Sequence, residues 1–398
     1  MKAGWQRNKL GDVCSFLNRG ISPKYLDQGG ICVVNQKCVR DHLVSYEQAR
    51  RHDVSAKTVS AERFIQLGDV LVNSTGTGTL GRVAQVREEP AEPTTVDSHV
   101  TIIRPIPGKF FPDFFGYMLI VIEEAIKEAG EGCGGQTELA RSVLTEQFLV
   151  SYPTVVAEQQ RIVGILDEAF DGIATAKANA EQNLQNARAL FESYLQSVFT
   201  QRGEGWVEKR LGEVYDVRDG THDSPKYHAA GFPLITSKNL KRAGLSFDDV
   251  NMINEQDFVK INQRSAVHKG DVLFAMIGTI GNPTLVTVEP NFAIKNVALF
   301  KIPQGQSGAF LKHYLASGWV ISKMMQEARG TTQKFVGLGY LRDFPINVPP
   351  LAKQLEVVES LDELSAETQC LESLYQRKLA ALDELKKSLL HQAFAGKL

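Results

Sequence analysis

Leu10-Gly11-Asp12-Val13, which follows Trp5, returns later in the chain as Leu211-Gly212-Glu213-Val214, which follows Trp206. The other matched stretches are Gly68-Asp69-Val70-Leu71 with Gly270-Asp271-Val272-Leu273, Leu166-Asp167-Glu168 with Leu361-Asp362-Glu363, and Phe199 with Phe394. The second half of the chain is therefore a diverged copy of the first, and each copy is an irregular domain followed by a long heptad helix. Such a repeat is typical of proteins whose partner is itself duplicated or two-fold symmetric.

The two helical segments have apolar side chains every three or four residues, which is the heptad pattern of a coiled coil. The seam residues are Ile162, Leu166, Ile173, Leu184, Phe191, Val357, Leu361, Leu364, Leu371, Leu379, Leu382 and Leu389. Lys386 breaks this seam, and we expect Leu385 beside it to cover the gap. Gly164 and Gly172 would each cost roughly 1 kcal/mol in an isolated helix, so a partner helix must stabilise the segment. The other copy is the obvious partner; the alternative is two amphipathic helices that each pack only on their own domain.

The order of the segments fixes how the helices run. We predict a first domain at 1–153, a helical region at 154–202, a second domain at 203–349 and a second helical region at 350–398. To pair with the first helix, the second must run back toward the first domain. The prediction is an antiparallel coiled coil of about 40 residues per helix and about 60 Å, with a pseudo-two-fold axis and a head at each end.

The heads are expected to be mixed and strand-rich, which makes the predicted fold class α+β. Period-two and apolar runs bounded by turn residues indicate strands at 69–74, 82–86, 100–104, 271–276, 284–288 and 297–302. One helical stretch is expected in each head, at 112–129 and at 309–328.

Composition narrows the class of protein only modestly. The 398 residues are 43% hydrophobic and 23% charged, with a formal net charge of −2, which fits an ordinary globular protein. A net charge this close to zero does not indicate any class of partner. Nucleic-acid binding would therefore depend on local patches of basic residues. No apolar run approaches the roughly 18 residues that span a bilayer, and the N-terminus has no apolar signal core. We therefore expect a cytoplasmic protein without a membrane segment.

The sequence contains no motif that predicts a cofactor site, a metal site or a catalytic site. Gly76-Thr77-Gly78-Thr79-Leu80-Gly81 matches a dinucleotide fingerprint, but a strand pattern follows it, whereas a pyrophosphate needs a helix N-terminus. Asn282-Pro283-Thr284 lacks the second proline and the aromatic residue of the DNA amino-methyltransferase motif. The five cysteines form no metal-ligand pattern and are expected to be reduced thiols: Cys14, Cys32, Cys38, Cys133 and Cys370. The chain is predicted to be a non-catalytic binder.

Polar, basic and aromatic residues gather at matching places in the two heads. Ser22-Pro23-Lys24-Tyr25 returns as Ser224-Pro225-Lys226-Tyr227, and Lys241-Arg242 extends the second polar stretch. Asn and Gln can pair with adenine, Arg and Lys with guanine, and hydroxyls and lysines with phosphates. The candidate DNA-binding residues are Arg19, Ser22, Lys24, Tyr25, Asn35, Gln36, Lys37, Arg40, Asn73, Ser74, Thr75, Thr77, His222, Ser224, Lys226, Tyr227, Thr236, Ser237, Lys238, Asn239, Thr279 and Lys334. The alternative for each is a polar surface loop with turn chemistry.

Over essentially its whole length the chain resembles the DNA-specificity subunit of type I restriction-modification systems. The resemblance is carried by the Trp-x4-Leu-Gly-Asp/Glu-Val start of each head, the Gly-Asp-Val-Leu strand with its Gly-Thr loop, and the passage from Phe344 to Gln354. That passage reads Phe-Pro-Ile-x-Val-Pro-Pro-Leu-Ala-x-Gln. The first copy departs from it at 154–162, with one extra residue and one proline fewer, which puts the start of the first long helix in doubt.

The resemblance implies two target recognition domains, each followed by a helical region. Each head would read one half of a split site in double-stranded DNA, and the coiled coil would set the spacer and bind two methyltransferase (modification) subunits. Motor-nuclease (restriction) subunits would join them, and S-adenosylmethionine, ATP and Mg²⁺ would be held by these partner subunits. Since the two heads have diverged, we predict an asymmetric, interrupted target.

Two other classes are open from the sequence. A coiled-coil scaffold with two protein-binding heads would explain the repeat, but it has no need of the paired Ser-Pro-Lys-Tyr loops. A stand-alone modification enzyme would carry its own cofactor and Asn-Pro-Pro-aromatic motifs.

Overall fold

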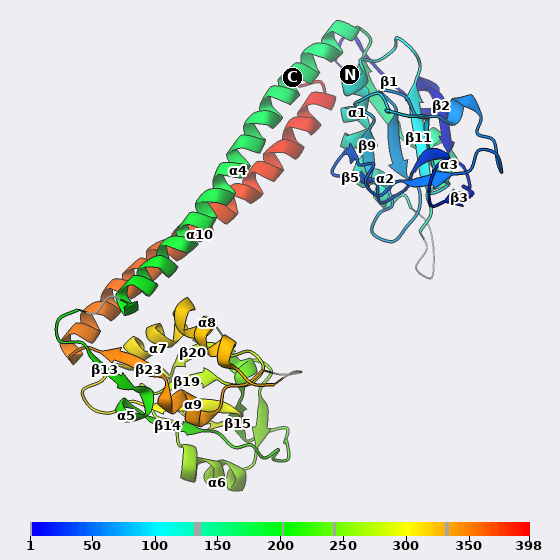
Figure 1. The fold of residues 1–398 in the computed structure, drawn as a ribbon. Helices are drawn as coiled ribbons and strands as arrows, with labels where there is room; N and C mark the ends of the chain where they lie inside the picture. Colours follow the sequence, from blue (N-terminus) through cyan, green and yellow to red (C-terminus); the bar gives the residue numbers. More distant parts are fainter. Residues whose placement is uncertain (1, 131–136, 201–202, 242–243, 331–333) are drawn as a thin grey trace. The chain divides into compact units, whose positions relative to one another are not determined.

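The computed structural model describes residues 2–130, 137–200, 203–241, 244–330 and 334–398 (Figure 1). It has two compact units, of which unit 1 comprises Met1–Asn179 with Lys378–Leu398 and unit 2 comprises Ala180–Arg377. Each unit contains one strand-rich head and parts of two long helices, α4 (Val156–Thr200) and α10 (Leu351–Phe394). The predicted domain boundaries follow the sequence repeat, whereas these units divide each long helix between them, so the boundaries stay a prediction.

The head of unit 1 is built on a four-stranded antiparallel sheet. Its strands, in spatial order, are β2 (Cys14–Arg19), β11 (Val100–Pro105), β8 (Val70–Asn73) and β9 (Val83–Gln85). The second sheet contains β10 (Thr94–Val96), β4 (Ile31–Val34), β7 (Arg50–His52) and β3 (Tyr25–Leu26), with β10 and β4 parallel. The smaller elements are the hairpin β5 (Val39–Arg40) and β6 (Leu43–Val44), the 3-10 helices η1 (Leu10–Val13) and η2 (Ala61–Arg63), and the helices α1 (Pro112–Val121), α2 (Glu123–Glu128) and α3 (Arg141–Glu146). Strand β1 (Trp5–Lys9) pairs with β12 (Leu149–Pro153), immediately before α4.

The head of unit 2 repeats this plan. Its main sheet contains β14 (Asp216–Asp219), β22 (Val297–Lys301), β19 (Val272–Ala275) and β20 (Gly281–Leu285) in the same order. The second sheet contains β18 (Asn251–Ile253), β15 (Phe232–Ile235) and β21 (Ala293–Ile294), and the hairpin is β16 (Leu240–Lys241) with β17 (Gly244–Leu245). The helices are α5 (Leu211–Val214), η3 (Ser237–Asn239), α6 (Glu255–Ser265), α7 (Gly308–Ala316), α8 (Gly318–Glu327) and α9 (Leu338–Asp343), and β13 (Val207–Arg210) pairs with β23 (Pro345–Val348) before α10. The predicted α+β fold class is confirmed.

The central strands β8 and β19 of the main sheets carry continuous apolar runs because both of their faces are covered. Val70 and Val72 face the core that contains α1 and the long helices, whereas Leu71 between them faces the second sheet. In unit 2, Val272 and Leu273 divide in the same way. Alternate side chains of a strand point to opposite faces, so such a run indicates a sheet covered on both sides.

The helical part of each head differs from the single stretch that the sequence predicts. The stretch 112–129 is interrupted at Ile122, between α1 and α2, and 309–328 is interrupted at Ser317, between α7 and α8. Ser317 has an extended backbone (φ −63°, ψ 136°) and its hydroxyl donates to the carbonyl of Tyr314 at 2.8 Å. This local bond competes with helical hydrogen bonding, as serine often does, and it divides the stretch into two helices.

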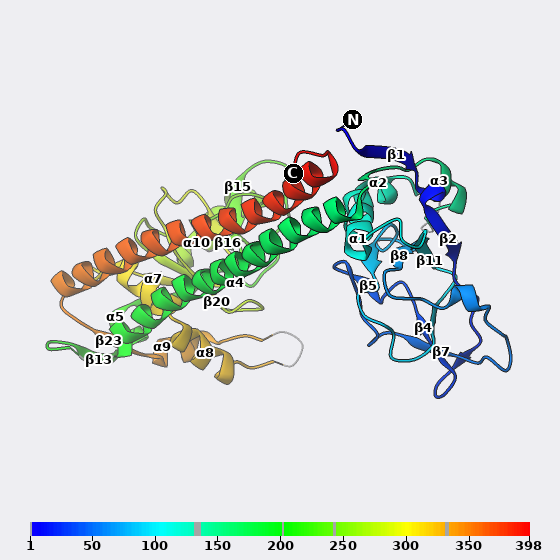
Figure 2. The ribbon, with the colours of Figure 1, turned by 90° about the horizontal axis from the view of Figure 1, so that it is seen from above.

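The two long helices pack antiparallel, as predicted (Figure 2). In unit 1 the start of α4, with Ile162 and Leu166, shares a core with Leu390 and Ala393 from the end of α10. In unit 2, Leu195 and Phe199 near the end of α4 share a core with Val357 and Leu361 near the start of α10. Ion pairs join the helices at Lys177–Asp383 (2.7 Å) and Arg188–Glu372 (3.0 Å).

The burial of the seam residues varies along the helices. Ile162, Leu166, Ile173, Val357 and Leu361 are buried, and Leu184, Phe191, Leu364, Leu379, Leu382 and Leu389 are half-buried. Leu371 is 37% exposed. Near the end of α4, Tyr194, which lies three residues after the seam residue Phe191 and so continues the heptad spacing, is 39% exposed, whereas its neighbour Leu195 is 1% exposed. The core of the unit 2 head takes the side chain next to the heptad position, because the helix packs on its head there as well as on α10.

Each long helix is attached to its head by a buried glutamine in its first turns. Gln159 is fully buried, accepts from the backbone N–H of Phe111 at 2.8 Å, and donates to the carbonyls of Lys109 and Pro153. Gln354 does the same in unit 2: it accepts from Ser307 N–H at 2.9 Å and donates to the Pro349 carbonyl at 2.9 Å. The resemblance leaves the start of the first long helix open, and the structure places it at Val156.

The repeated Leu-Asp-Glu stretch makes a second attachment. Asp167 accepts a hydrogen bond from the Tyr117 hydroxyl on α1, and burial raises the pKa of Tyr117 to about 12. Asp362 lies 2.8 Å from Nε2 of His313 on α7. Burial lowers the pKa of His313.

Candidate nucleic-acid interface

Hydrogen bonds join loops at one end of the unit 1 head. Thr75, after β8, bonds through its hydroxyl to Nδ1 of His99, before β11, at 2.6 Å. Arg19, at the end of β2, forms an ion pair with Glu138 at 2.6 Å and donates to the Leu139 carbonyl at 2.7 Å. Thr75 is also in a β-bridge with Glu138. These bonds bring four separate segments of the chain into one surface.

The loops of unit 2 meet in the same way. The backbone N–H of Gly278, after β19, donates to the Lys334 carbonyl at 2.9 Å, and Nζ of Lys334 donates to the Met325 carbonyl at 3.5 Å. Lys295, after β21, donates to the Ser224 hydroxyl at 2.7 Å. The repeat therefore builds an equivalent loop surface on each head.

Four of the candidate DNA-binding residues are buried and hold these loops together. Asn35 is 9% exposed and bonds to the Lys37 N–H and the Gln48 carbonyl; Asn239 is 3% exposed and bonds to Thr236 and Ser246. The other two, both fully buried, are Asn73, which donates to the carbonyls of Gln36 and Thr79, and Ser74, which bonds to Thr101. Buried polar groups that are already hydrogen-bonded cannot reach a base edge without breaking those bonds. Their placement favours a role in shaping the loops.

Most of the other candidates lie at the surface. The exposed ones are Ser22, Lys24, Tyr25, Lys37, Arg40 and Thr77 in unit 1, and His222, Ser224, Lys226, Tyr227, Lys238, Thr279 and Lys334 in unit 2. The half-buried ones are Arg19, Gln36, Thr75, Thr236 and Ser237. Gln36 accepts from the Thr79 hydroxyl at 3.2 Å, which ties the β4–β5 loop to the glycine-rich loop. Exposed Lys, Tyr, Ser and Thr side chains of this kind can contact phosphates and base edges.

The glycine-rich loop leads into strand β9, and no helix follows it. Gly76, Gly78 and Gly81 have φ values of 105°, 76° and 80°, which suit glycine alone. The resulting turn keeps Thr75 and Thr79 beside the neighbouring loops.

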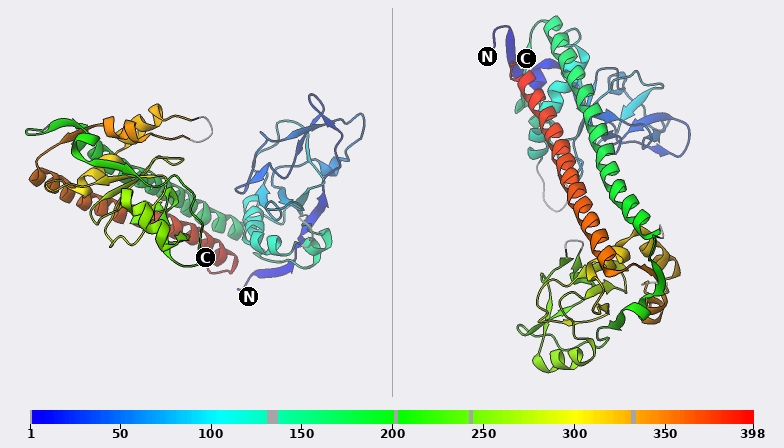
Figure 3. Two further views of the ribbon diagram at one scale, coloured as in Figure 1. Left: turned by 90° about the horizontal axis from the view of Figure 1, so that it is seen from below. Right: turned by 90° about the vertical axis from the view of Figure 1, so that its left-hand side faces the viewer.

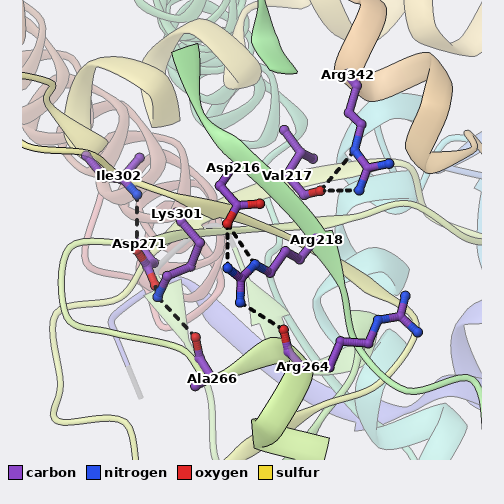
Figure 4. Close-up of polar contacts among 9 residues, drawn as sticks. All are labelled: Asp216, Val217, Arg218, Arg264, Ala266, Asp271, Lys301, Ile302 and Arg342. Atoms are coloured by element: carbon purple, nitrogen blue, oxygen red, sulfur yellow. Dashed lines mark hydrogen bonds and ion pairs between the residues drawn. The ribbon is translucent and has the colours of Figure 1, made fainter. Parts of the chain in front are cut away.

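A buried ion pair at the other end of the same strands, away from the loop surface, accounts for the repeated Gly-Asp-Val-Leu stretch in each head. Asp69 forms two bonds with the Arg104 guanidinium, at 2.7 and 2.8 Å, and its side chain is 1% exposed. Burial outweighs Arg104 and raises the pKa of the Asp69 carboxyl. In unit 2, Asp271 pairs with Lys301 and accepts from the Ile302 N–H at 3.2 Å (Figure 4). These pairs join β8 to β11 and β19 to β22.

Further polar contacts in unit 2 fix β14, the strand that leads into the His222 loop (Figure 4). Arg218 pairs with Asp216 at 2.6 Å and donates to the Arg264 carbonyl at 3.0 Å. Arg342 on α9 donates to the Val217 carbonyl at 2.7 Å. The strand is thereby tied to both α6 and α9.

Several residues that the sequence reasoning missed lie on these loop surfaces. Arg50 stacks on the Tyr25 ring, 3.4 Å from its centroid, and His99 bonds to Thr75. In unit 2 the missed residues are Arg264, Lys295 and Asn296, which contact His222, Asp219 or Ser224. Arg50 belongs to the basic run Arg50-Arg51-His52, which is a signal in the sequence. The others come from segments far from the tetrads, so only the fold brings them together.

Arg242 and Cys133, two residues of the sequence predictions, lie outside the described residues. Within the described part of the chain, no group of three or more His, Cys, Asp or Glu side chains is arranged to hold a metal ion. A helix both long and apolar enough to cross a bilayer is likewise absent from the described segments.

The comparisons with known proteins agree on one family. The family described as "Type I restriction modification DNA specificity domain" matches residues 2–186 and again 203–377. The EcoBI type I restriction enzyme specificity subunit of Escherichia coli is 22% identical over 336 residues, which is 77% of this chain and 70% of the relative. The EcoKI specificity subunit of Escherichia coli strain K12 is 21% identical over 263 residues, or 61% of this chain and 56% of the relative.

Solved structures share the fold. A chain from a structure on complex assembly and conformational transition of the type I R-M system superposes with a TM-score of 0.79 at 17% identity, covering 100% of this chain and 99% of that one. The HsdS subunit from Thermoanaerobacter tengcongensis gives 0.67 at 18% identity, covering 100% and 98%. Because the family matches both halves of the repeat, the chain belongs to the type I restriction-modification DNA-specificity family.

Proposed function

We propose that this protein is the DNA-specificity subunit of a type I restriction-modification complex, in which each head contacts one part of an interrupted, asymmetric DNA site. The observation that carries the proposal is the pair of equivalent exposed loops, with Lys24 and Tyr25 on one head and Lys226 and Tyr227 on the other. Lysines on such loops can neutralise backbone phosphates. Divergence of the surrounding residues is what two different half-sites would require.

The assignment also implies partners. The long antiparallel helices would set the spacer between the half-sites and bind two modification subunits, and restriction subunits would join to cleave DNA. Methyl transfer and cleavage, with S-adenosylmethionine, ATP and Mg²⁺, would be the work of those subunits. This chain would supply recognition alone and would reside with its DNA in the cytoplasm.

The experiment is the salt dependence of DNA binding by the protein in complex with its modification subunits. A lysine that neutralises a phosphate contributes about one unit to the slope of log K against log [salt]. We expect Lys24→Ala and Lys226→Ala each to weaken binding to duplex DNA and to lower that slope by about one unit. Fluorescence anisotropy over a series of salt concentrations measures both quantities.

Lys353→Ala is the matched control, because Lys353 is an exposed lysine that pairs with Glu356 on α10, away from the loops. Its slope should equal that of the wild type. Unchanged slopes in both loop variants would remove these lysines from the interface. Wild-type binding that does not depend on salt at all would instead favour a scaffold with two protein-binding heads.

A further inference from the structure

His222 is held by both nitrogens of its ring. Nδ1 lies 2.8 Å from Oδ1 of Asn296, and Nε2 lies 2.8 Å from Oδ2 of Asp219. A neutral imidazole donates from one nitrogen only, whereas an imidazolium donates from both and satisfies the two oxygens that face the ring. The geometry therefore favours the charged form of His222.

The side chains that hold this ring come from separate elements. Asp219, at the end of β14, has an 8% exposed side chain, whereas the His222 side chain is 56% exposed. Asn296, between β21 and β22, has a left-handed backbone with φ 55°, which asparagine tolerates better than most residues. The nearly buried Asp219 and the constrained backbone at Asn296 hold the His222 ring in position, while part of the ring is open to solvent.

Two further cations contact the carboxylate and the loop that hold the ring in place. Arg264, on α6, forms an ion pair with the same Asp219 carboxylate and has a 66% exposed side chain. Lys295, next to Asn296, donates to the Ser224 hydroxyl in the His222 loop at 2.7 Å. The charged groups at this place are thus His222, Arg264 and Lys295 against Asp219, with Asp223 exposed on the same loop.

Positive charges exceed negative ones at this surface, and the most deeply placed carboxylate is already shared by two cations. An exposed arrangement of this kind suits an anion with several acceptor oxygens, such as a backbone phosphate of DNA. His222 has no counterpart at the matching place in head 1, because Ser22-Pro23-Lys24-Tyr25 follows Ile21 directly, whereas His222 and Asp223 precede the matching tetrad in head 2.

We propose that His222, Arg264 and Lys295 form a binding site for a DNA backbone phosphate in head 2, and that the site takes its phosphate only while His222 is protonated. The inference rests on the proposed function and names a contact within it. Its consequence is a pH dependence of DNA binding that belongs to one head.

The sign of this dependence follows from the bonds to the ring. Hydrogen bonds from His222 to Asn296 and then to Asp219 raise the pKa of the imidazole above its ordinary value of 6.5, while Arg264 opposes them. The charged form is therefore complete below the ordinary pKa and is lost as the pH rises through the raised value. DNA binding should weaken over that range.

The test is fluorescence anisotropy of a labelled duplex of mixed sequence with the complex of this chain and its modification subunits, at constant ionic strength from about pH 6 to about pH 8.5. We expect the wild-type affinity to fall about threefold to tenfold over this range, and the salt slope to fall by about one unit. His222→Gln should show at pH 6 the affinity and slope that the wild type shows at the alkaline end. Lys295→Gln should lower the slope but keep the pH dependence.

His228→Gln is the matched control, because His228 is an exposed histidine in the same loop of head 2. It should retain the wild-type profile, and thermal melts should show that every variant is folded. A pH profile that persists in His222→Gln, or a flat wild-type profile with intact salt-dependent binding, would overturn this site while the proposed function stands. Wild-type binding without any salt dependence would overturn the proposed function and this site together.

Discussion

Two buried glutamines, Gln159 and Gln354, explain why a glutamine occurs at the start of each long helix. Gln159 and Gln354 each use both ends of the side-chain amide to join the first turn of a long helix to the start of α1 or α7. An amide is suited to this position because it both donates and accepts. The final Gln of the Pro-Pro-Leu-Ala-x-Gln passage is therefore a connection between helix and head.

We expect Gln159→Leu to lower the free energy of unfolding by about 3 kcal/mol, because the Phe111 N–H and the carbonyls of Lys109 and Pro153 would lose a partner inside the protein. Thermal or urea denaturation measures the loss. Gln160→Leu, at the exposed neighbouring position, is the control and should change stability by less than about 0.5 kcal/mol. Equal losses in the two variants would contradict the role given to Gln159.

For the candidate DNA-binding residues, the sequence predicted correctly that their side chains form hydrogen bonds, but it did not predict which of them are exposed. Asn35 and Asn73 are hydrogen-bonding residues in loops, as the pattern indicates, but their amides are turned inward to the Lys37 N–H and the Gln36 carbonyl. Hydrogen bonds that shape a loop and hydrogen bonds that read a base use the same side chains, so sequence alone does not separate them. Asn296 is distant in sequence from Asp219 and His222, so no local pattern indicates that the three residues are in contact.

Among the elements, the long helices were the most predictable, because a heptad repeat can be recognised directly in the sequence. The detail at Lys386 differs from the prediction that Leu385 covers the gap. Leu385 is 47% exposed, whereas Lys386 is half-buried in the seam, with its ammonium 5.0 Å from the centroid of the Phe170 ring. The lysine keeps the heptad position by laying its apolar stem along the partner helix and directing its charge at an aromatic face.

We expect Lys386→Leu to raise the melting temperature, with a gain of about 1 kcal/mol, because burial of leucine outweighs the lost cation–π contact. The companion variant Leu385→Lys replaces an exposed side chain and should leave the melting temperature nearly unchanged. Scanning calorimetry of the full chain measures both. A large loss in Leu385→Lys would mean that Leu385 belongs to the seam after all.

The helices of the heads were harder to predict than the long helices. Hydrophobic periodicity continues across Ser317, so the pattern suggests one helix where two meet. The break depends on the serine hydroxyl and on packing of α7 and α8 in the head core, which are tertiary effects. The inner strands β8, β11, β19 and β22 of the main sheets were predicted from their short apolar runs, whereas the strands of the second sheets were not predicted.

For the whole molecule, the two copies correspond in their main sheets and in their connections to the long helices, whereas the second sheets differ and α6 stands where head 1 has the short helix η2. Both main sheets have the same strand order, each head ends in a strand that pairs with its first strand, and a long helix follows at once. The duplication visible in the sequence therefore predicted the plan of the second head from the first. The copies differ most in the loops, as expected if the two heads recognise different DNA sequences.

The register of the two helices allows a test of the spacer. Lys177 pairs with Asp383 and Arg188 with Glu372, so deleting 177–183 together with 377–383 removes one matched heptad from each helix. We expect the gap between the half-sites to shorten by about 10 Å of helix, or roughly three base pairs, with the half-sites unchanged. Methylation-motif sequencing in cells that carry the partner subunits reports both.

Deleting 177–183 alone is the control, since it shifts the seam of one helix against the other and should abolish methylation. Altered half-site bases with an unchanged gap in the double deletion would show that the helices do not set the spacing.

Unit 1 is completed by the last residues of the chain. Figure 3 shows the two marked ends of the chain, both in unit 1, near one another. Leu390 and Ala393 lie in the same core as Leu10 and Phe114, the Phe394 ring is 4.9 Å from that of Phe114, and Lys2 donates to the Leu398 carbonyl at 2.9 Å. A ribosome makes this head early but cannot supply Leu390 and Ala393, which close its core, until it has translated the second long helix. During synthesis, the first head must therefore wait with an open apolar surface, whereas unit 2, formed from one continuous stretch, can finish folding before it.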